Sequence, residues 1–234
     1  MGDYDSFAAD YDVWADHMTA DVGWFVELAS EAREPIVELA VGSGRVAIPI
    51  ARATGKRVIG IDSSPAMLDI ARERAGDLPL ELREGDMRDF ELEQPVDLVI
   101  CPFRSLLHLP TWQDKRRVFE RVAAALKPGG RFAWNAFVFS PFIAAGNHEQ
   151  KRQLGDTGHW ELVRHAPSDN RVDIVRGRGE TTTGVLRLWW STKSEWEGLL
   201  EVAGLETEAL YSGFDREPFD DDSLEFVWVA RKPA

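Results

Sequence analysis

The sequence of 234 residues predicts an α/β fold, a doubly wound and mostly parallel sheet of seven strands that includes an antiparallel C-terminal strand pair. Three observations predict it. Short β-branched runs alternate with helical patterns, a glycine-rich loop follows the first run, and strand-like segments replace the alternation after residue 137. Strands and helices that alternate at this spacing form right-handed βαβ units, which build a parallel sheet.

The parallel strands are expected where apolar, β-branched runs lie between turn residues. They cover residues 35–40, 57–62, 78–85, 96–103 and 131–137. Helices are expected between them, and two more before the first strand, over residues 45–54, 65–75, 112–127, 4–18 and 20–31. Thr111 is a typical N-cap for the helix that follows it, and the sequence KPGG is typical of the residues just past its end.

After the fifth strand, the segments HWELVRHA, NRVDIVRGRGE and GVLRLWWS are typical of antiparallel strands. They predict a small antiparallel insertion on the substrate side of the fold. A helix in KSEWEGLLEVAGL and two closing strands, ETEALYSGF and SLEFVWVARK, complete the chain. We expect a single domain with four parts, namely an N-terminal helical lid, a cofactor-binding core, the insertion, and the C-terminal helix with its strand pair, over residues 1–34, 35–137, 138–191 and 192–234.

Composition narrows the class of protein. No apolar run approaches the roughly 20 residues that cross a bilayer, and the N-terminus lacks a signal-peptide pattern, so a cytoplasmic protein is expected. The single cysteine, Cys101, excludes an internal disulfide framework and a four-thiolate metal site, and no metal is expected. The net charge of −13 argues against a nucleic-acid partner, because phosphate binding needs a basic surface.

The glycine loop lies in ELAVGSGRVAIPIA, residues 38–51, where Gly42 to Ala47 match the dinucleotide fingerprint G-x-G-x-x-G/A. The preceding Glu38 does not belong to that fingerprint. Its carboxylate would repel the pyrophosphate of a dinucleotide and would favour an ammonium group. S-adenosylmethionine carries an ammonium and a sulfonium and no phosphate, so Glu38 favours methyl transfer over hydride transfer.

Polar or small residues follow the first four strands, at the edge where an open parallel sheet binds its ligands. Asp62 lies 18 residues after Gly44, close to the spacing of a carboxylate that accepts ribose hydroxyls. Asp86, in GDM after the third strand, can accept from the adenine amino group, while Met87 packs on the ring or presents its backbone N–H.

Four motifs in order, ELAVGSGR, VIGIDSSPAML, EGDMRDF and VDLVICPF, together with LKPGGRFAW, resemble the class I S-adenosylmethionine-dependent methyltransferases. The resemblance covers residues 36–137 and extends to the C-terminal strand pair. It implies a Rossmann-like fold and an enzyme of the bacterial type that methylates small molecules. The N-terminal YDSFAADYDVWA resembles the tyrosine-bearing segment that covers the cofactor in many of these enzymes.

The resemblance also implies roles for individual residues. The methionine part would be lined by Glu38, Ala40, Gly42 and Gly44, and its carboxylate reached by Tyr11, with Arg45 as a further candidate. The adenosine would be held by Asp62, Ser63, Met67, Asp86 and Met87, and the sulfonium bordered by Cys101 and Phe103. Two residues depart from the pattern. Ala40 stands where the family usually has its first glycine, and Val41 where it often has a small residue.

The methyl group of a sulfonium is already activated, so the enzyme chiefly aligns the acceptor with it and excludes water. A general base is needed only when the acceptor must lose a proton. His108, in SLLHL after the fourth strand, is the candidate for that role, and the alternative is a histidine that caps a loop or packs in place.

The expected function is methyl transfer from S-adenosylmethionine to a nitrogen or oxygen of a small molecule, with S-adenosylhomocysteine as the product. Cys101-Pro102 reverses the Pro-Cys order of the cytosine carbon methyltransferases, which also favours a small-molecule methyl acceptor. No nucleic acid or membrane partner is expected, and the protein is expected to be a monomer or a homodimer. The alternatives are a non-catalytic S-adenosylmethionine-binding protein and a nicotinamide-dependent oxidoreductase.

Overall fold

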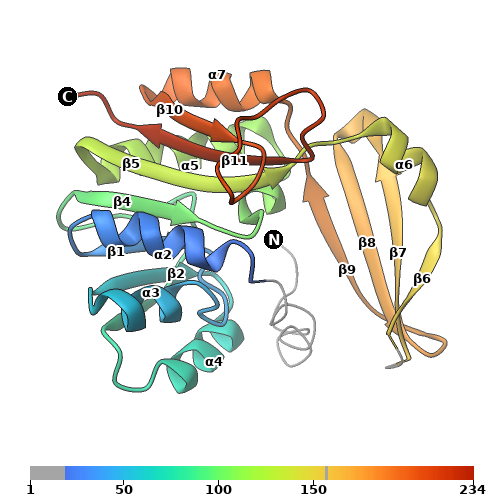
Figure 1. Cartoon of the computed structure of the whole chain (residues 1–234). Coiled ribbons are helices and arrows are strands. Elements are labelled where there is room, and N and C mark those ends of the chain that lie inside the picture. The colour runs from blue at the N-terminus through green and yellow to red at the C-terminus, as the bar shows by residue number, and fades with distance from the viewer. Residues whose placement is uncertain (1–18, 156–157) are drawn as a thin grey trace.

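A computed structural model describes residues 19–155 and 158–234 (Figure 1). The expected helix over 4–18, and Tyr11 within it, lie outside the described residues. The seven strands of the main sheet are β1 (Ile36–Leu39), β2 (Val58–Asp62), β3 (Leu80–Glu84), β4 (Val96–Cys101), β5 (Leu126–Phe137), β10 (Glu206–Tyr211) and β11 (Glu225–Arg231).

These strands lie in the order β10-β11-β5-β4-β1-β2-β3. The first five strands along the chain pair in parallel, while β11 pairs antiparallel with both β5 and β10. The predicted doubly wound sheet with its antiparallel C-terminal pair is therefore confirmed. Strand order reverses between β1 and β4, which places the ligand crevice of an open α/β sheet at their carboxyl ends.

Two layers of helices cover the sheet. The helices α2 (Val22–Glu31), α3 (Ala47–Thr54) and α4 (Pro65–Ala75) pack on one face, and α5 (Trp112–Ala125) and α7 (Lys193–Ala203) on the other. Phe25 of α2 is fully buried against the first of these faces. Residues 22–31 thus belong to the core layer and do not form part of the expected lid.

A second sheet lies beside the edge at which the parallel strands end (Figure 1). Its antiparallel strands are β6 (Lys151–Leu154), β7 (His159–Ala166), β8 (Arg171–Arg178) and β9 (Thr181–Trp189), and the helix α6 (Pro141–Asn147) leads into it. The predicted antiparallel insertion is present. Its sequence pattern did not indicate α6 or β6.

Lys115 of α5 fastens this insertion to the core. Its ammonium donates to the Trp189 carbonyl at 2.7 Å and to the Ser191 hydroxyl at 2.7 Å, and it lies over the Trp196 ring. Burial lowers the pKa of Lys115 to about 8. The end of β9 is therefore held at a fixed position beside the carboxyl edge of the main sheet.

The start of α7 is stabilised by a capping box. The Thr192 hydroxyl accepts from the Glu195 backbone N–H at 3.2 Å, and the Glu195 carboxylate accepts from the Thr192 backbone N–H at 2.7 Å. Thr192→Ala is expected to lower the free energy of unfolding by about 1 kcal/mol in urea titrations, because it removes one of these two bonds. Ser194→Ala, an exposed substitution in the same turn, is the matched control and should change it by less than about 0.5 kcal/mol.

Within the described residues, no helix combines the length and the apolar character that a membrane span requires.

Candidate active site

The loop between β1 and α3 is built on left-handed backbone at alternate residues. Ala40, Gly42 and Gly44 have φ angles of 56°, 55° and 83°. The φ angle of Gly44 favours glycine, and a Cβ atom there would lie 2.7 Å from Ile48 Cδ1, so the Ile48 side chain would have to move. Ala40 adopts the same conformation with a methyl group, at the position where the family usually has glycine, and this costs about 1–2 kcal/mol.

Val41, the second departure from the family pattern, is accommodated by a glycine on the neighbouring strand. A Cβ atom on Gly60 of β2 would lie 2.7 Å from Val41 Cγ2. Val41 is buried, and its backbone N–H donates to the Ile61 carbonyl at 3.1 Å. The larger side chain thus fills space that Gly60 leaves, and the path of the loop is kept.

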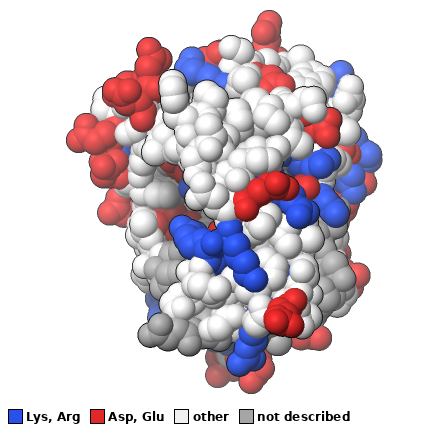
Figure 2. Space-filling view, turned by 90° about the vertical axis from the view of Figure 1, so that its right-hand side faces the viewer, with Lys and Arg blue, Asp and Glu red and all other residues white. Residues whose placement is uncertain are grey.

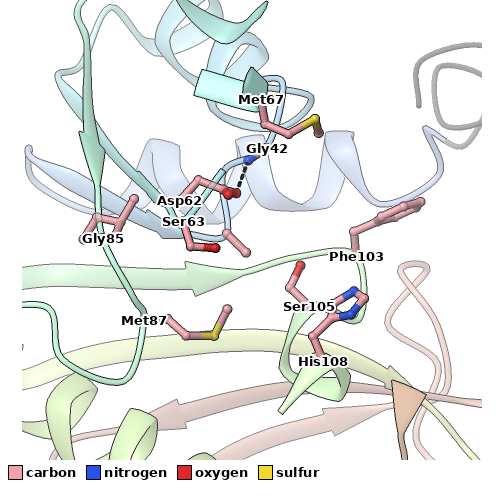
Figure 3. Close-up of a pocket in the computed structure, with 11 residues that line it drawn as sticks. Gly42, Asp62, Ser63, Met67, Gly85, Met87, Phe103, Ser105 and His108 are labelled. Atoms are coloured by element: carbon pink, nitrogen blue, oxygen red, sulfur yellow. Dashed lines mark hydrogen bonds between the residues drawn. The ribbon is translucent and has the colours of Figure 1, made fainter. Parts of the chain in front are cut away.

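Asp62 ends β2 and holds the loops on both sides of it. Its carboxylate accepts from the Gly42 backbone N–H at 2.8 Å through one oxygen and from the Ser64 backbone N–H at 2.9 Å through the other. Figure 3 shows the first of these bonds and the carboxylate at the side of a pocket. Ser64 in turn caps α4 by accepting from the Met67 backbone N–H. The carboxylate therefore has a fixed orientation.

The pocket beside Asp62 contains about 610 Å³ of empty space, its open mouth included. Eight residues expected at the site line it, namely Ala40, Gly42, Asp62, Ser63, Met67, Met87, Phe103 and His108. Ile61, Gly85 and Ser105 also line it and were not expected. Each of these three lies within two residues of a predicted one, so the strand-end pattern could have included them.

Glu38 lies behind the pocket wall. It is 2% exposed, and its Oε2 atom has no hydrogen-bond partner among the described residues. Burial raises the pKa of Glu38 well above its usual value, and Asp21 and Asp62 raise it further, while Arg45 acts in the opposite direction. A buried carboxylate with an unused oxygen is suited to a cationic hydrogen-bond donor.

Arg45 and Asp86, both predicted cofactor residues, lie outside the pocket lining and are paired with other side chains. The Arg45 guanidinium donates to both carboxylate oxygens of Asp21, at 2.7 and 2.5 Å. Asp86 pairs with Arg88 at 2.6 Å, and this hydrogen bonding lowers the pKa of Asp86. Asp86 is thus a carboxylate at neutral pH, and contact with a ligand requires it to share its oxygens with Arg88.

Gly44 and Cys101 also lie outside the lining. Cys101 is fully buried at the end of β4, and burial together with Glu38 raises the pKa of its thiol. A thiol in this environment stays protonated, so Cys101 packs beneath the site and is not a nucleophile. Among the described residues, no three or more His, Cys, Asp or Glu side chains gather as metal ligands.

His108 lines the pocket at the end of the 3-10 helix η1 (Ser105–His108), on the side opposite Asp62 (Figure 3). Its ring bonds to the backbone of Arg187 in β9, so the insertion closes this side. Burial lowers the pKa of His108 to about 4. The imidazole is therefore neutral at physiological pH and can accept a hydrogen bond, but it is a weak base.

The residues of the pocket fit an adenosyl ligand with a cationic tail. Asp62 is the only charged side chain among the described residues that line it, and the buried Glu38 carboxylate lies near. Neither would attract a pyrophosphate. Ala40 and Gly42 of the left-handed loop line the space without large side chains, and the side chains of Met67 and Met87 offer apolar contact to a flat ring (Figure 3).

Comparison with known proteins gives the same family. Residues 36–130 match the model of a methyltransferase domain. The chain is 34% identical over 210 residues to dTDP-3-amino-3,6-dideoxy-alpha-D-glucopyranose N,N-dimethyltransferase of Streptomyces fradiae, a match that covers 83% of this chain and 78% of the relative. It is 24% identical over 204 residues to the cypemycin N-terminal methyltransferase of Streptomyces sp, over 84% and 82% of the two chains. Among solved structures, the CcbJ methyltransferase of Streptomyces caelestis superposes with a TM-score of 0.83 at 27% identity, over 98% of this chain and 97% of that one.

Proposed function

Since this chain belongs to the S-adenosylmethionine-dependent methyltransferases, we propose that its acceptor is the amine nitrogen of a small molecule. The cofactor supplies a methyl group activated on a sulfonium. The protein has to bind it, align the acceptor with it and exclude water. The described pocket carries side chains for each of these tasks.

For the cofactor, Asp62 is proposed to accept both ribose hydroxyls, and Glu38 to accept the ammonium of the methionine part. The remaining proposed assignments are those that the family resemblance implies: Ala40, Gly42 and Gly44 at the methionine part, Ser63, Met67, Asp86 and Met87 at the adenosine, and Phe103 with Cys101 near the sulfonium. Of these, Gly44, Asp86 and Cys101 lie outside the pocket lining. Tyr11 stays a prediction outside the described residues.

One observation favours nitrogen over oxygen as the acceptor atom. An alcohol must lose its proton as it is methylated, which calls for a general base with a pKa near neutrality. Among the described residues that line the pocket, the titratable side chains are Asp62, engaged by two backbone N–H groups, and His108, whose pKa is about 4. A neutral amine already carries the lone pair that attacks, and its surplus proton leaves to water afterwards.

Two of the similar proteins support this choice, because the Streptomyces fradiae relative is named for dimethylation of an amino sugar and the cypemycin enzyme for an N-terminus. A small-molecule acceptor also agrees with the negative net charge of the protein. The net charge is −13, and Figure 2 shows acidic side chains among the basic ones on the face that carries the second sheet, with no continuous basic surface there.

The proposal is tested by incubating the protein with S-adenosylmethionine and a panel of matched small amines and alcohols, and measuring S-adenosylhomocysteine release. Turnover with amines alone supports it. Turnover with alcohols alone would move the acceptor atom to oxygen. Binding of the cofactor without turnover of any acceptor would favour the non-catalytic binding protein.

His108→Gln is expected to lower kcat by about tenfold without weakening S-adenosylhomocysteine binding. The reason is that the imidazole orients the acceptor amine by accepting a hydrogen bond from one of its N–H groups. The kcat/KM of the wild type should rise with pH through the ammonium pKa of the acceptor itself, since only the neutral amine reacts. The same inflection in the His108→Gln variant would agree with this role. An inflection that belongs to the enzyme and disappears in the variant would instead make His108 the general base.

A further inference from the structure

Arg45 connects the glycine loop to the start of α2. It directly follows Gly44, and its side chain is 10% exposed. The guanidinium donates from Nη1 and Nη2 to the two carboxylate oxygens of Asp21, whose side chain is 6% exposed and stands at the N-terminus of α2. A buried bidentate pair of this kind fixes the plane of the guanidinium.

The same guanidinium lies over the ring of Phe103, with its Cζ atom 4.2 Å from the ring centroid. Phe103 follows β4 and forms one side of the pocket (Figure 3). Arg45 thus uses its edge for Asp21 and its flat face for Phe103. A lysine would not reproduce this arrangement, because an ammonium has neither the planar fork that bonds both oxygens of Asp21 nor a flat face to lie parallel to the ring.

The backbone at Phe103 needs this support. Phe103 and Arg104 have φ angles of 59° and 62°, two consecutive non-glycine residues in the left-handed region. Such residues cost energy and persist only where their surroundings hold them. On the far side, Arg104 pairs with Glu225 of β11 and its backbone N–H donates to Asn135 of β5. The ring of Phe103 is held by Arg45.

We propose that Arg45 is a positioning residue, which holds the Phe103 side of the cofactor pocket in place and does not itself contact the cofactor. The inference rests on the proposed function, because it takes the pocket to bind S-adenosylmethionine. It replaces the expected contact between Arg45 and the methionine carboxylate. Both terminal nitrogens of the Arg45 guanidinium, Nη1 and Nη2, already donate to Asp21, and its face lies over Phe103.

If Arg45 acts through Phe103, the effects of changing the two residues cannot be independent. A double-mutant cycle measures this directly. Dissociation constants for S-adenosylhomocysteine are measured by calorimetry for the wild type, Arg45→Met, Phe103→Leu and the double variant. Each single change is expected to weaken binding by about tenfold, and the double variant by about the same tenfold.

Independent effects would give a double variant weakened by about a hundredfold, as expected if Arg45 binds the methionine carboxylate directly, and would overturn the proposal. A wild type that binds no S-adenosylhomocysteine would contradict the proposed function instead, so the two failures are distinguishable. Arg45→Lys tests whether binding needs the planar shape of the guanidinium or only its positive charge. It is expected to bind as weakly as Arg45→Met, whereas recovery of wild-type binding would show that only the positive charge matters and would also overturn the proposal.

Two further variants control for stability. Arg45→Met leaves the Asp21 carboxylate buried without its partner, so Asp21→Asn/Arg45→Met removes both charges and should fold while keeping the tenfold weaker binding. Arg131→Met removes the ion pair to Glu31, at the opposite end of α2, and should leave the dissociation constant unchanged. In kinetics, the KM for S-adenosylmethionine should rise about tenfold in Arg45→Met with kcat within about twofold of wild type. A fall in kcat with an unchanged KM would contradict a role in positioning the pocket.

Discussion

Replacing Asp62 by alanine is expected to weaken S-adenosylhomocysteine binding by about a hundredfold or more in calorimetric titrations. Hydrogen bonds to a charged group contribute about 1.5–3 kcal/mol each, and the two ribose hydroxyls would lose both of theirs. The substitution also releases the backbone N–H groups of Gly42 and Ser64, which the carboxylate now accepts at 2.8 and 2.9 Å. The ligand contact and the shape of the loop are therefore lost together.

The affinity of Asp62→Asn for S-adenosylhomocysteine should lie between those of the wild type and Asp62→Ala, because the amide retains one acceptor oxygen. The matched control is Asp97→Ala, which removes the partner of Lys127 and Arg33 away from the pocket. It should lower stability and leave the dissociation constant within about twofold of the wild type. Wild-type affinity in Asp62→Ala would show that the pocket does not bind the adenosine ribose.

The parallel sheet could be predicted because its strands are buried on both faces. Residues of β1, β2 and β4 are almost all buried, so each strand appears in the sequence as a continuous apolar run between turn residues. The predicted bounds of these strands differ from the observed ones by two residues or fewer. Helix α4 was predicted at its observed residues, because Pro65 begins it and Gly76 follows its last residue.

Elements of the insertion were missed where they are exposed. The strand β6 has the sequence KRQL, with three exposed residues and one half-buried one, and it depends on pairing with β7 and not on an apolar face. The helix α6 has only one buried residue, Ala144. Hydrophobic periodicity records burial, so segments held chiefly by backbone pairing leave little of it in the sequence.

The positions of the site residues could be predicted more reliably than the directions of their side chains. The motifs gave the correct strand ends, since parallel strands bring these to one edge. They did not show that Arg88, two residues after Asp86, pairs with its carboxylate, or that Asp21 receives Arg45. Both pairs depend on tertiary neighbours. Tryptophan side chains can stack on a flat ligand, but Trp134, Trp160, Trp189 and Trp190 all lie outside the lining of the described pocket.

Trp134 shows why the role of a tryptophan cannot be read from the sequence of this protein. It is fully buried in β5 and stacks on Trp228 of β11, with 5.6 Å between ring centroids and 7° between planes. Trp190 stacks in the same manner on Phe139, at 4.4 Å and 5°. In both cases a flat partner is provided by the protein, and the sequence alone does not distinguish such a partner from a flat ligand.

Glu38→Gln is expected to raise the stability of the free protein at neutral pH and to weaken cofactor binding by about a hundredfold. Burial raises the pKa of Glu38 above its usual value of 4.5, so the folded state binds the proton more tightly than the unfolded chain does. The unfolding free energy of the wild type therefore falls as pH rises from the unfolded pKa towards the folded one. Glutamine has no charge to desolvate, and the variant should lack this fall.

Thermal unfolding between pH 4 and pH 8 measures the difference. The Tm of Glu38→Gln should match that of the wild type near pH 4 and exceed it at pH 7. Glu81→Gln is a control of opposite sign, since hydrogen bonding from Arg83 lowers the pKa of Glu81 and its charge favours the folded state. The wild type should lose the stabilisation from the Glu81 charge as pH falls through the Glu81 pKa. Glu81→Gln lacks this stabilisation, so its Tm at pH 7 should lie below that of the wild type.

Ligand binding should reverse the order of the Tm values of the wild type and Glu38→Gln. S-adenosylhomocysteine carries the same ammonium as the cofactor, and an ion pair with Glu38 would favour the carboxylate that burial disfavours. Removal of one partner of a buried pair costs about 3–5 kcal/mol, so saturating ligand should raise the Tm of the wild type far more than that of Glu38→Gln. A variant that gains stability and keeps wild-type affinity would place the ammonium elsewhere. A variant that loses both stability and affinity would show that the Glu38 side chain stabilises the free protein through bonds to its neighbours. The buried carboxylate would then not lower the stability of the free protein.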